Sequence, residues 1–281
     1  MAEPMGSPRL RVGLIGAGRA GTVLARAFER VGHHCVAVNA VSDASRERAA
    51  RMLPSADLMD PIALCATVDL IIVAVPDDVI GAVVNGLVAA DAISERHIVM
   101  HMSGRHGTQV LARAAAAGAT VFAAHPAMTL HASAEDVERL QHCPFGVTAQ
   151  EEALPIALAL VYEIGGVPTA IAEADRVLYH AALAHASNHT VTLLGQSMEM
   201  LQSIGIEQAG DYVRSLVATT VERALLEGDA ALTGPIARGD WATVRAHLEA
   251  LAASTLPPTT TSTYRALAEA TAARHGKHLE V

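Results

Sequence analysis

The sequence Val12-Gly-Leu-Ile-Gly-Ala-Gly-Arg-Ala-Gly21 joins a short apolar run to three glycines spaced G-x-G-x-x-G, which are Gly16, Gly18 and Gly21. The apolar run is typical of a buried parallel strand, and residues 22–31 have the spacing of an amphipathic helix. In such a turn the first glycine permits a tight bend, the second lets backbone approach a pyrophosphate, and the third lets the helix pack close to the strand. The helix N-terminus then offers unpaired N–H groups to phosphates. The alternative is a glycine-rich turn that binds nothing.

Apolar runs and helical segments alternate as far as residue 172, after which the strand signals stop. This alternation predicts an α/β fold with a doubly wound parallel Rossmann sheet, whose ligands lie beyond the carboxyl ends of the strands. We therefore expect a dinucleotide-binding domain over residues 1–172 and a smaller all-helical domain, for substrate binding and dimerisation, over residues 173–281. Strands are expected at 10–15, 35–41, 69–75, 98–101, 120–124, 145–149 and 167–171.

The composition excludes several classes of partner. The net charge of −9 argues against nucleic acid and anionic membranes. No apolar run approaches the ~20 residues that a membrane span needs, and residues 1–8 lack the apolar segment of a secretion signal. Cys35, Cys65 and Cys143 lie far apart, without the spacing of a metal site. We expect a cytoplasmic protein with no metal, no nucleic-acid partner and no membrane partner.

The residues that close the second expected strand distinguish NADP from NAD. An acidic residue about 20 positions past the glycines would bind the ribose 2′-hydroxyl, but residues 39–42 include none. Ser42 with Arg46 or Arg48 can instead accept a 2′-phosphate, and Arg19 in the glycine turn can assist. The alternative is that these arginines form a solvated helix face. We predict NADP as the cofactor, bound by Gly16, Ala17, Gly18, Arg19, Ala20, Gly21, Ser42, Arg46, Val75, Pro76 and Asp77.

Polar residues follow two further strands at the end of the sheet where ligands are expected. Ser103 can hydrogen-bond the substrate or the cofactor carboxamide. His125 can act as the acid that protonates a carbonyl oxygen, since the unperturbed pKa of histidine is about 6.5. The alternative for His125-Pro126 is a rigid turn without chemistry.

Residues 175–204 have the pattern of one long helix with an apolar face and a face of small and polar residues. Asn188 lies on the polar stripe at 100° per residue, His185 borders it, and His180 lies between the two faces. These residues are candidates for the catalytic site. The alternatives are close helix packing with Asn188 hydrogen-bonded internally, and a structural role for His180 in the core.

A third candidate site is the stretch of Thr233, Gly234, Pro235 and Arg238. Pro235 suits the first turn of a helix, and exposed N–H groups together with a guanidinium would bind a carboxylate. A plain helix cap explains the stretch equally well. Lys277 is the only lysine of the chain, so a mechanism that needs a lysine must use it or be rejected.

Together these motifs resemble a known family over nearly the whole chain. It is the Rossmann-like family whose C-terminal helical domain carries a domain-of-unknown-function label, and it is similar to pyrroline-5-carboxylate reductase and to the C-terminal domain of 6-phosphogluconate dehydrogenase. The resemblance rests on the glycine turn, Val75-Pro-Asp-Asp78, His125-Pro126, Tyr179-His-Ala-Ala182, Ser187-Asn188 and Leu232-Thr-Gly-Pro-Ile-Ala-Arg-Gly-Asp240.

The resemblance implies an NADP-dependent oxidoreductase, and some members look like an alternative ketopantoate (2-dehydropantoate) reductase. Relatives dimerise through the helical domain, often with one subunit closing the other's site, for which residues 233–240 are candidates. Related hydroxyacid dehydrogenases place a lysine four residues before the asparagine on the long helix, where this sequence has Ala184. The expected proton donor is therefore His180, His185 or His125.

We therefore expect a homodimeric NADPH-dependent reductase of a small 2-oxo acid. Asn188 and Ser103 position this anionic substrate, and Arg238 binds its carboxylate. The alternatives are an imine reductase of the pyrroline-5-carboxylate type and a non-catalytic NADP-binding regulatory protein, which the absent lysine makes plausible.

Overall fold

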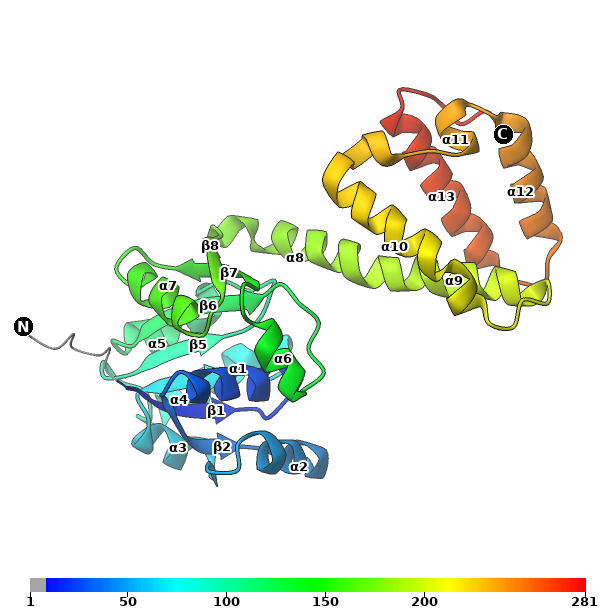
Figure 1. Ribbon diagram of the computed structural model, residues 1–281. Helices are drawn as coiled ribbons and strands as arrows, with labels where there is room; N and C mark the ends of the chain where they lie inside the picture. The colour runs from blue at the N-terminus through cyan, green and yellow to red at the C-terminus, as the bar shows by residue number, and fades with distance from the viewer. Residues whose placement is uncertain (1–8) are drawn as a thin grey trace, which may run out of the picture. The chain divides into compact units, whose positions relative to one another are not determined.

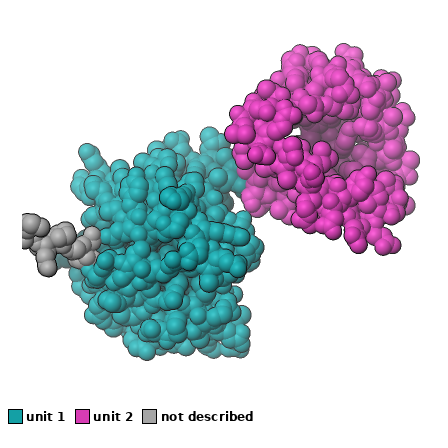
Figure 2. All heavy atoms as spheres, viewed as in Figure 1, with its two compact units in different colours: residues 1–184 teal, residues 185–281 magenta. Residues whose placement is uncertain are grey.

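The computed structural model describes residues 9–281, and the prediction made for residues 1–8 lies outside them. The chain divides into two compact units, one that extends to Ala184 and one from His185 to Val281 (Figures 1 and 2). The first is built around a β-sheet, and the second consists of helices.

The first unit contains an eight-stranded sheet in the order β3-β2-β1-β4-β5-β6-β7-β8. Because β1 has β2 on one side and β4 on the other, the winding direction reverses beside β1, and the strand ends open into a crevice there. The strands are β1 (Arg11–Ile15), β2 (His34–Asn39), β3 (Asp57–Leu58), β4 (Leu70–Val73), β5 (Ile98–His101), β6 (Thr120–Pro126), β7 (Pro144–Ala149) and β8 (Val167–Ala170).

Alternate side chains of the central strands enter two separate cores on opposite faces of the sheet. In β4, Leu70 and Ile72 belong to one core, whereas Ile71 and Val73 belong to the other. Helices on both faces confirm the predicted doubly wound α/β fold (Figure 1). The first core takes residues from α1 (Arg19–Arg30), α2 (Asp43–Met52), α6 (Ala134–Arg139) and α7 (Leu154–Glu163), and the second from α3 (Pro61–Thr67), α4 (Ile80–Ala89) and α5 (Ala112–Ala116).

The sheet differs from a fully parallel one at a single pair, because β7 runs antiparallel to β6. A parallel neighbour would need a crossover along the full length of the sheet. The connecting helix α6 rises only about 9 Å, whereas a strand as long as β6 spans about 23 Å. The sequence prediction also omitted β3, α3 and α6, although Asp60 followed by Pro61 is a helix-start signal that α3 uses.

His125 and Pro126 are part of β6, so this strand extends two residues beyond its expected end at residue 124, and the alternative of a rigid turn is excluded. Pairing with β5 ends at Ala123, and beyond that residue β6 continues only against β7, where Pro126 pairs with Phe145. The side chain of His125 is therefore held by a strand.

The helix expected at residues 175–204 is present as a continuous helical run from Arg176 to Ser203, with a π-helical segment within it. Helix α8 (Arg176–Ala184) closes the first unit, and the second begins with a π-helical segment, His185–His189, followed by α9 (Thr190–Ser203). Helix α13 begins at Pro258, a favourable residue for a first turn. The remaining helices are α10 (Ala209–Glu227), α11 (Pro235–Arg238), α12 (Trp241–Ala253) and α13 (Pro258–Arg274).

The second unit has a small core of its own. Val244 and Leu248 of α12 pack with Ala268 of α13, and Trp241 and Tyr264 border them. Asp240 caps α12, since its carboxylate accepts a hydrogen bond of 3.2 Å from the backbone N–H of Thr243.

Candidate functional site

The three glycines of the turn after β1 are explained in different ways by their surroundings. Gly16 has a φ of +92°, and a Cβ there would lie 2.6 Å from the carbonyl oxygen of Ala74. A Cβ on Gly21 would lie 2.5 Å from the Cβ of Ala74, so close packing of α1 on the sheet requires glycine. Gly18 is different, because its φ is −72° and a Cβ would come no closer than 3.8 Å to the protein. Folding therefore does not require glycine at position 18.

Helix α1 begins directly after Gly18 with its N-terminus uncapped. No side chain caps it, and its first turn contains no acidic residue. Its first backbone N–H groups are therefore free to bind an anion, which the helix dipole also favours. The turn is anchored from the other side, because Arg48 donates a hydrogen bond of 2.7 Å to the carbonyl oxygen of Ala17.

Two adjoining cavities extend from this turn across the sheet. The first, of about 320 Å³, follows the turn and the end of β4 to Ser103, and the second, of about 350 Å³, reaches His125. Arg19, Ala20 and Met102 border both cavities. The first is also lined by Gly18, Gly21 and residues 73–77, and the second by Pro126 and residues 128–130. The structure thus brings most of the predicted residues to these two cavities, and Gly16 and Ala17 line neither of them. The predicted residues that line the cavities are Gly18, Arg19, Ala20, Gly21, Val75, Pro76, Asp77, Ser103 and His125.

Ser103 joins the loops that follow β4 and β5. Its hydroxyl donates a hydrogen bond of 2.7 Å to Oδ2 of Asp77 and accepts one of 3.2 Å from the backbone N–H of His106. Arg105 Nε lies 3.6 Å from the same carboxylate oxygen. The only donor of the Ser103 side chain is therefore already used within the protein.

His101 fixes the loop after β5 from inside. Its Nδ1 accepts from the backbone N–H of Ser103 at 3.1 Å, so Nε2 carries the proton and donates to the carbonyl oxygen of Gly107 at 2.7 Å. Burial lowers the pKa of His101 to about 4, and the imidazole is neutral at pH 7. His101 therefore has a structural role.

His125 lies in a cluster with Tyr179, His180 and Arg176 of α8. Its Nδ1 is 3.1 Å from the Tyr179 hydroxyl, and its ring centroid is 5.9 Å from that of His180. Burial, the Arg176 charge and His180 lower the pKa of His125 to about 4, although Asp77 raises it. His125 is neutral at pH 7, which differs from the expected acid with an unperturbed pKa.

Arg176 is a buried cation with no ion pair among residues 9–281. It is 1% exposed, its Nε donates to the carbonyl oxygen of His106, and its Nη1 donates to that of Gly146. Its Nη2 is sealed from solvent and has no partner. Sequence reasoning missed Arg176 because an arginine at a helix start normally indicates a solvated position. The motif Tyr179-His-Ala-Ala182 contributed to the family resemblance, but the sequence indicated no role for the Tyr179 phenol.

The predicted 2′-phosphate residues lie on α2, the helix after β2. Ser42 caps this helix, and its hydroxyl accepts a hydrogen bond of 3.2 Å from the backbone N–H of Ser45. Arg46 is exposed and pairs with Asp43 at 3.1 Å. The last residue of β2 is Asn39, so the strand ends without a carboxylate.

The other predicted residues belong to the second unit. Asn188 and His185 lie in the π-helical segment, and His185 Nδ1 is 2.7 Å from Nδ1 of His189. Thr233, Gly234, Pro235 and Arg238 form the start and end of the one-turn helix α11. Lys277 donates to the carbonyl oxygen of Ala237 at the end of α11, which gives the only lysine a structural role.

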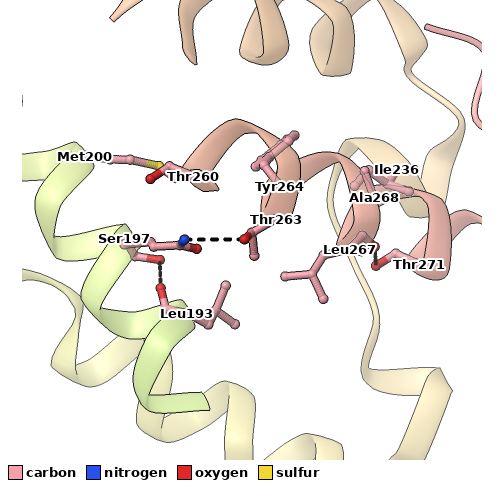
Figure 3. Close-up of a pocket in the computed structure, with 11 residues that line it drawn as sticks. Leu193, Ser197, Met200, Ile236, Thr260, Thr263, Tyr264, Leu267, Ala268 and Thr271 are labelled. Atoms are coloured by element: carbon pink, nitrogen blue, oxygen red, sulfur yellow. Dashed lines mark hydrogen bonds between the residues drawn. The ribbon is translucent and has the colours of Figure 1, made fainter. Parts of the chain in front are cut away.

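The second unit also contains an apolar cavity of about 270 Å³ between α9 and α13 (Figure 3). Leu193 and Met200 line one side, and Leu267 lines the other. The Gln196 amide donates to the Thr263 hydroxyl at 3.4 Å across it. Nothing in this cavity matches a predicted catalytic residue.

In the chain from residue 9 onward, no helix is long and apolar enough to cross a membrane. Over the same residues, no group of three or more His, Cys, Asp or Glu side chains is arranged to hold a metal ion.

The fold and the glycine turn define a Rossmann-like domain followed by an all-helical domain, and sequence comparison agrees. Residues 2–126 match the Rossmann-like domain family, and residues 143–271 match a domain of unknown function (DUF2520). The chain thus combines these two domains. No curated protein matches the sequence significantly.

Solved structures share the fold over nearly the whole chain. A protein from Bacteroides fragilis provisionally named an NADP oxidoreductase has a TM-score of 0.74 at 22% identity, covering 94% of this chain and 98% of its own. The imine reductase from Myxococcus stipitatus, in complex with NADP+, has a TM-score of 0.68 at 18% identity, covering 95% and 96%. The pyrroline carboxylate reductase from Plasmodium falciparum, with NADP bound, has a TM-score of 0.58 at 13% identity, covering 95% and 98%.

Proposed function

We propose that this protein is an NADPH-dependent reductase of a small, anionic 2-oxo acid. The observation that carries the proposal is the contrast among the three glycines. Protein packing requires Gly16 and Gly21, whereas space beside Gly18 is left free at the uncapped start of α1. A pyrophosphate bound to the α1 N–H groups fits that space. The structural relatives whose names include NADP support the same cofactor.

The residues around the first cavity are suited to hold the dinucleotide. Backbone N–H groups of the glycine turn would bind the pyrophosphate, and Val75 to Asp77 would border the next part of the cofactor. The absence of a carboxylate at the end of β2 supports a 2′-phosphate held by Ser42 and Arg46. When bound, reduced nicotinamide supplies a hydride, and the protein supplies orientation, charge and a proton.

The buried cation Arg176 favours an oxo acid over an imine. Reduction of a carbonyl group develops negative charge on oxygen, which a nearby unpaired guanidinium stabilises. Reduction of an imine passes through a cationic iminium, which the same charge disfavours. Imine reduction remains the second candidate because the fold resembles imine reductases and pyrroline carboxylate reductase.

We also propose that Asn188, His180 and His185 contact the substrate, and that Thr233 to Arg238 bind its carboxylate. Support for Asn188 comes from its sequence pattern and from its place in a π-helical segment, a feature frequent at functional sites. The four-residue helix α11 has too short a dipole to bind a carboxylate alone, so Arg238 carries this part of the proposal. We infer a cytoplasmic protein because its three cysteines are free and buried.

We propose in addition that two copies associate through their second units. Helix α10 exposes apolar side chains on both sides, with Leu216 70% exposed and Leu225 83% exposed. Val191 of α9 and Ile204 after it are exposed as well. Apolar surface of this extent is typical of an interface between subunits, and a second copy presents the same surface.

A panel of 2-oxo acids and cyclic imines tests the function, with loss of NADPH absorbance as the measurement. We expect ketopantoate, or a 2-oxo acid of similar size, to be reduced, and Asn188→Ala to abolish its reduction. Asn85→Ala, which changes a half-buried asparagine of α4, is the matched control and should leave the rate unchanged. Reduction of imines alone would favour the second candidate. A tight NADPH complex inert towards the whole panel would identify a regulatory protein.

A further inference from the structure

We propose that His125 delivers the proton to the reduced substrate and takes its replacement from Tyr179, so that the two side chains form a proton relay. Arg176 stabilises the tyrosinate that the relay leaves behind. The inference rests on the proposed function. It assigns a role to Tyr179, a positioning residue that acts through His125, and to the buried charge beside it.

The relay assigns the donor in the contact between these two side chains. The Tyr179 hydroxyl lies 3.1 Å from His125 Nδ1, and in the relay the phenol donates its proton to that nitrogen. This hydrogen bond selects the tautomer of His125 that carries its proton on Nε2. His125 lines the second cavity, and Nε2 has no hydrogen-bond partner among residues 9–281. The proton therefore lies on the atom available to a substrate.

Two glycines make room for this pair. A Cβ on Gly146, opposite His125 in the β6–β7 register, would lie 2.6 Å from the Tyr179 hydroxyl. A Cβ on Gly104 would lie 3.1 Å from His125 Nε2 and would collide with His180. Neither glycine has a positive φ, so side-chain space is what these positions require.

Arg176 provides a buried positive charge that forms no ion pair among residues 9–281. Its guanidinium carbon is 5.7 Å from the Tyr179 ring centroid, and its Nη2 is buried without a partner. Burial raises the pKa of Tyr179, and Arg176 and the Gly146 hydrogen bond offset part of this shift. Burial, together with the Arg176 charge, lowers the pKa of His125 and keeps it neutral, and a neutral imidazole needs a second group if it is to donate a proton.

The relay is balanced in atoms and charge. One hydride, which carries the two electrons of the reduction, comes from the reduced nicotinamide named in the proposed function. The Nε2–H bond of His125 breaks as the substrate oxygen gains its proton, and Nδ1 gains the proton of the Tyr179 O–H bond. His125 stays neutral throughout and never becomes an imidazolate, because Tyr179 takes the negative charge. The reset returns the Nδ1 proton to Tyr179 and takes one proton from water at Nε2.

The first test measures a single turnover of hydride transfer with the best substrate of the panel. Tyr179→Phe should lower this rate by about 10²-fold or more, which is the usual contribution of general acid catalysis, with little change in NADPH affinity. The rate of the natural protein in mixtures of H₂O and D₂O should fit two protons in motion, and that of Tyr179→Phe only one. Tyr162→Phe alters an exposed tyrosine of the same unit and should leave both measurements unchanged.

The second test needs no substrate. In ¹⁵N-histidine spectra of the full chain, the His125 signals should show an Nε2-protonated neutral ring at pH 7. Tyr179→Phe should raise the Nδ1-protonated fraction, because that nitrogen loses its donor. Gly146→Ala keeps every titratable group but displaces the phenol, and it should produce the same change.

These measurements separate the relay from the proposed function. If no member of the panel is reduced, the proposed function is refuted. The His125 spectra alone then test whether Tyr179 donates its proton to His125. The relay is overturned if folded Tyr179→Phe retains the natural single-turnover rate. It is equally overturned if the tautomer ratio of His125 is the same in Tyr179→Phe as in the natural protein.

Discussion

The hydroxyl of Ser103 donates a 2.7 Å hydrogen bond to the carboxylate of Asp77, and this contact ties the loop after β5 to the loop after β4. The sequence predicted that Ser103 binds the substrate. Since its only donor is used, we expect Ser103→Ala to lower the free energy of unfolding by about 1.5 kcal/mol, as for a hydrogen bond to a charged group, with little change in substrate KM.

Chemical denaturation and steady-state kinetics on the same samples check this prediction. Ser203→Ala, which removes a local hydrogen bond to the carbonyl oxygen of Met200, is the control and should change neither quantity appreciably. A raised KM with unchanged stability would instead support direct substrate binding by Ser103.

The glycine turn allows a sharper experiment. Gly18→Ala should fold normally, because its φ is −72° and the added methyl meets no protein atom within 3.8 Å, yet it should weaken NADPH binding at least tenfold. Gly16→Ala should destabilise the fold, since φ is +92° and the methyl would collide with Ala74. Calorimetric titration and thermal unfolding separate the two effects. Unaltered NADPH affinity in Gly18→Ala would remove the main support for the proposed function.

Arg46 is expected to set the preference between the two dinucleotides. Arg46→Ala should weaken NADPH binding about tenfold and leave NADH binding unchanged, because only NADPH has the 2′-phosphate. Arg26→Ala is the matched control, since Arg26 also forms an exposed pair with an acidic residue three positions away. Equal losses for both cofactors in Arg46→Ala would show that this arginine does not contact the 2′-phosphate.

Stability should fall as pH drops below neutrality because His101 is buried as the neutral form. Its pKa is about 4 in the folded protein against an ordinary value of 6.5, so the unfolded chain binds the extra proton between these values. The stabilisation is complete above pH 6.5 and is lost progressively towards pH 4, to a total of about 3 kcal/mol.

Urea unfolding at a series of pH values measures this slope. His101→Asn should make the free energy of unfolding less dependent on pH, by the contribution of one histidine. His34→Asn, at an exposed position of β2, should leave this dependence unchanged. An unchanged slope in His101→Asn would mean that another group causes the acid sensitivity.

The oligomeric state should depend on α10. Replacing both Leu216 and Leu225 with aspartate should convert a dimer into a monomer, because charge cannot be buried at an apolar interface without a partner. Sedimentation velocity gives the mass, and Ile62→Asp, at an exposed position of α3, should remain dimeric. A natural protein that sediments as a monomer would refute the proposed dimer directly.

Local sequence patterns predicted much of the fold, because hydrophobic periodicity and glycine turns act over a few residues. The strand–glycine–helix stretch at residues 11–30 appears as expected. The antiparallel β7 did not follow from any pattern, since strand direction depends on where the chain returns to the sheet. The π-helical segment within the long helix, at residues 185–189, also gave no local signal.

The sequence by itself determined the sheet, the glycine turn and the missing acid after β2, all of which are local in the chain. Only the tertiary structure showed that Gly18 is free of packing and that Ser103 is already bonded to Asp77. It also placed Tyr179 and Arg176 beside His125, some 50 residues away in the chain. That placement lowers the pKa of His125, because burial and a neighbouring charge are properties of position in space.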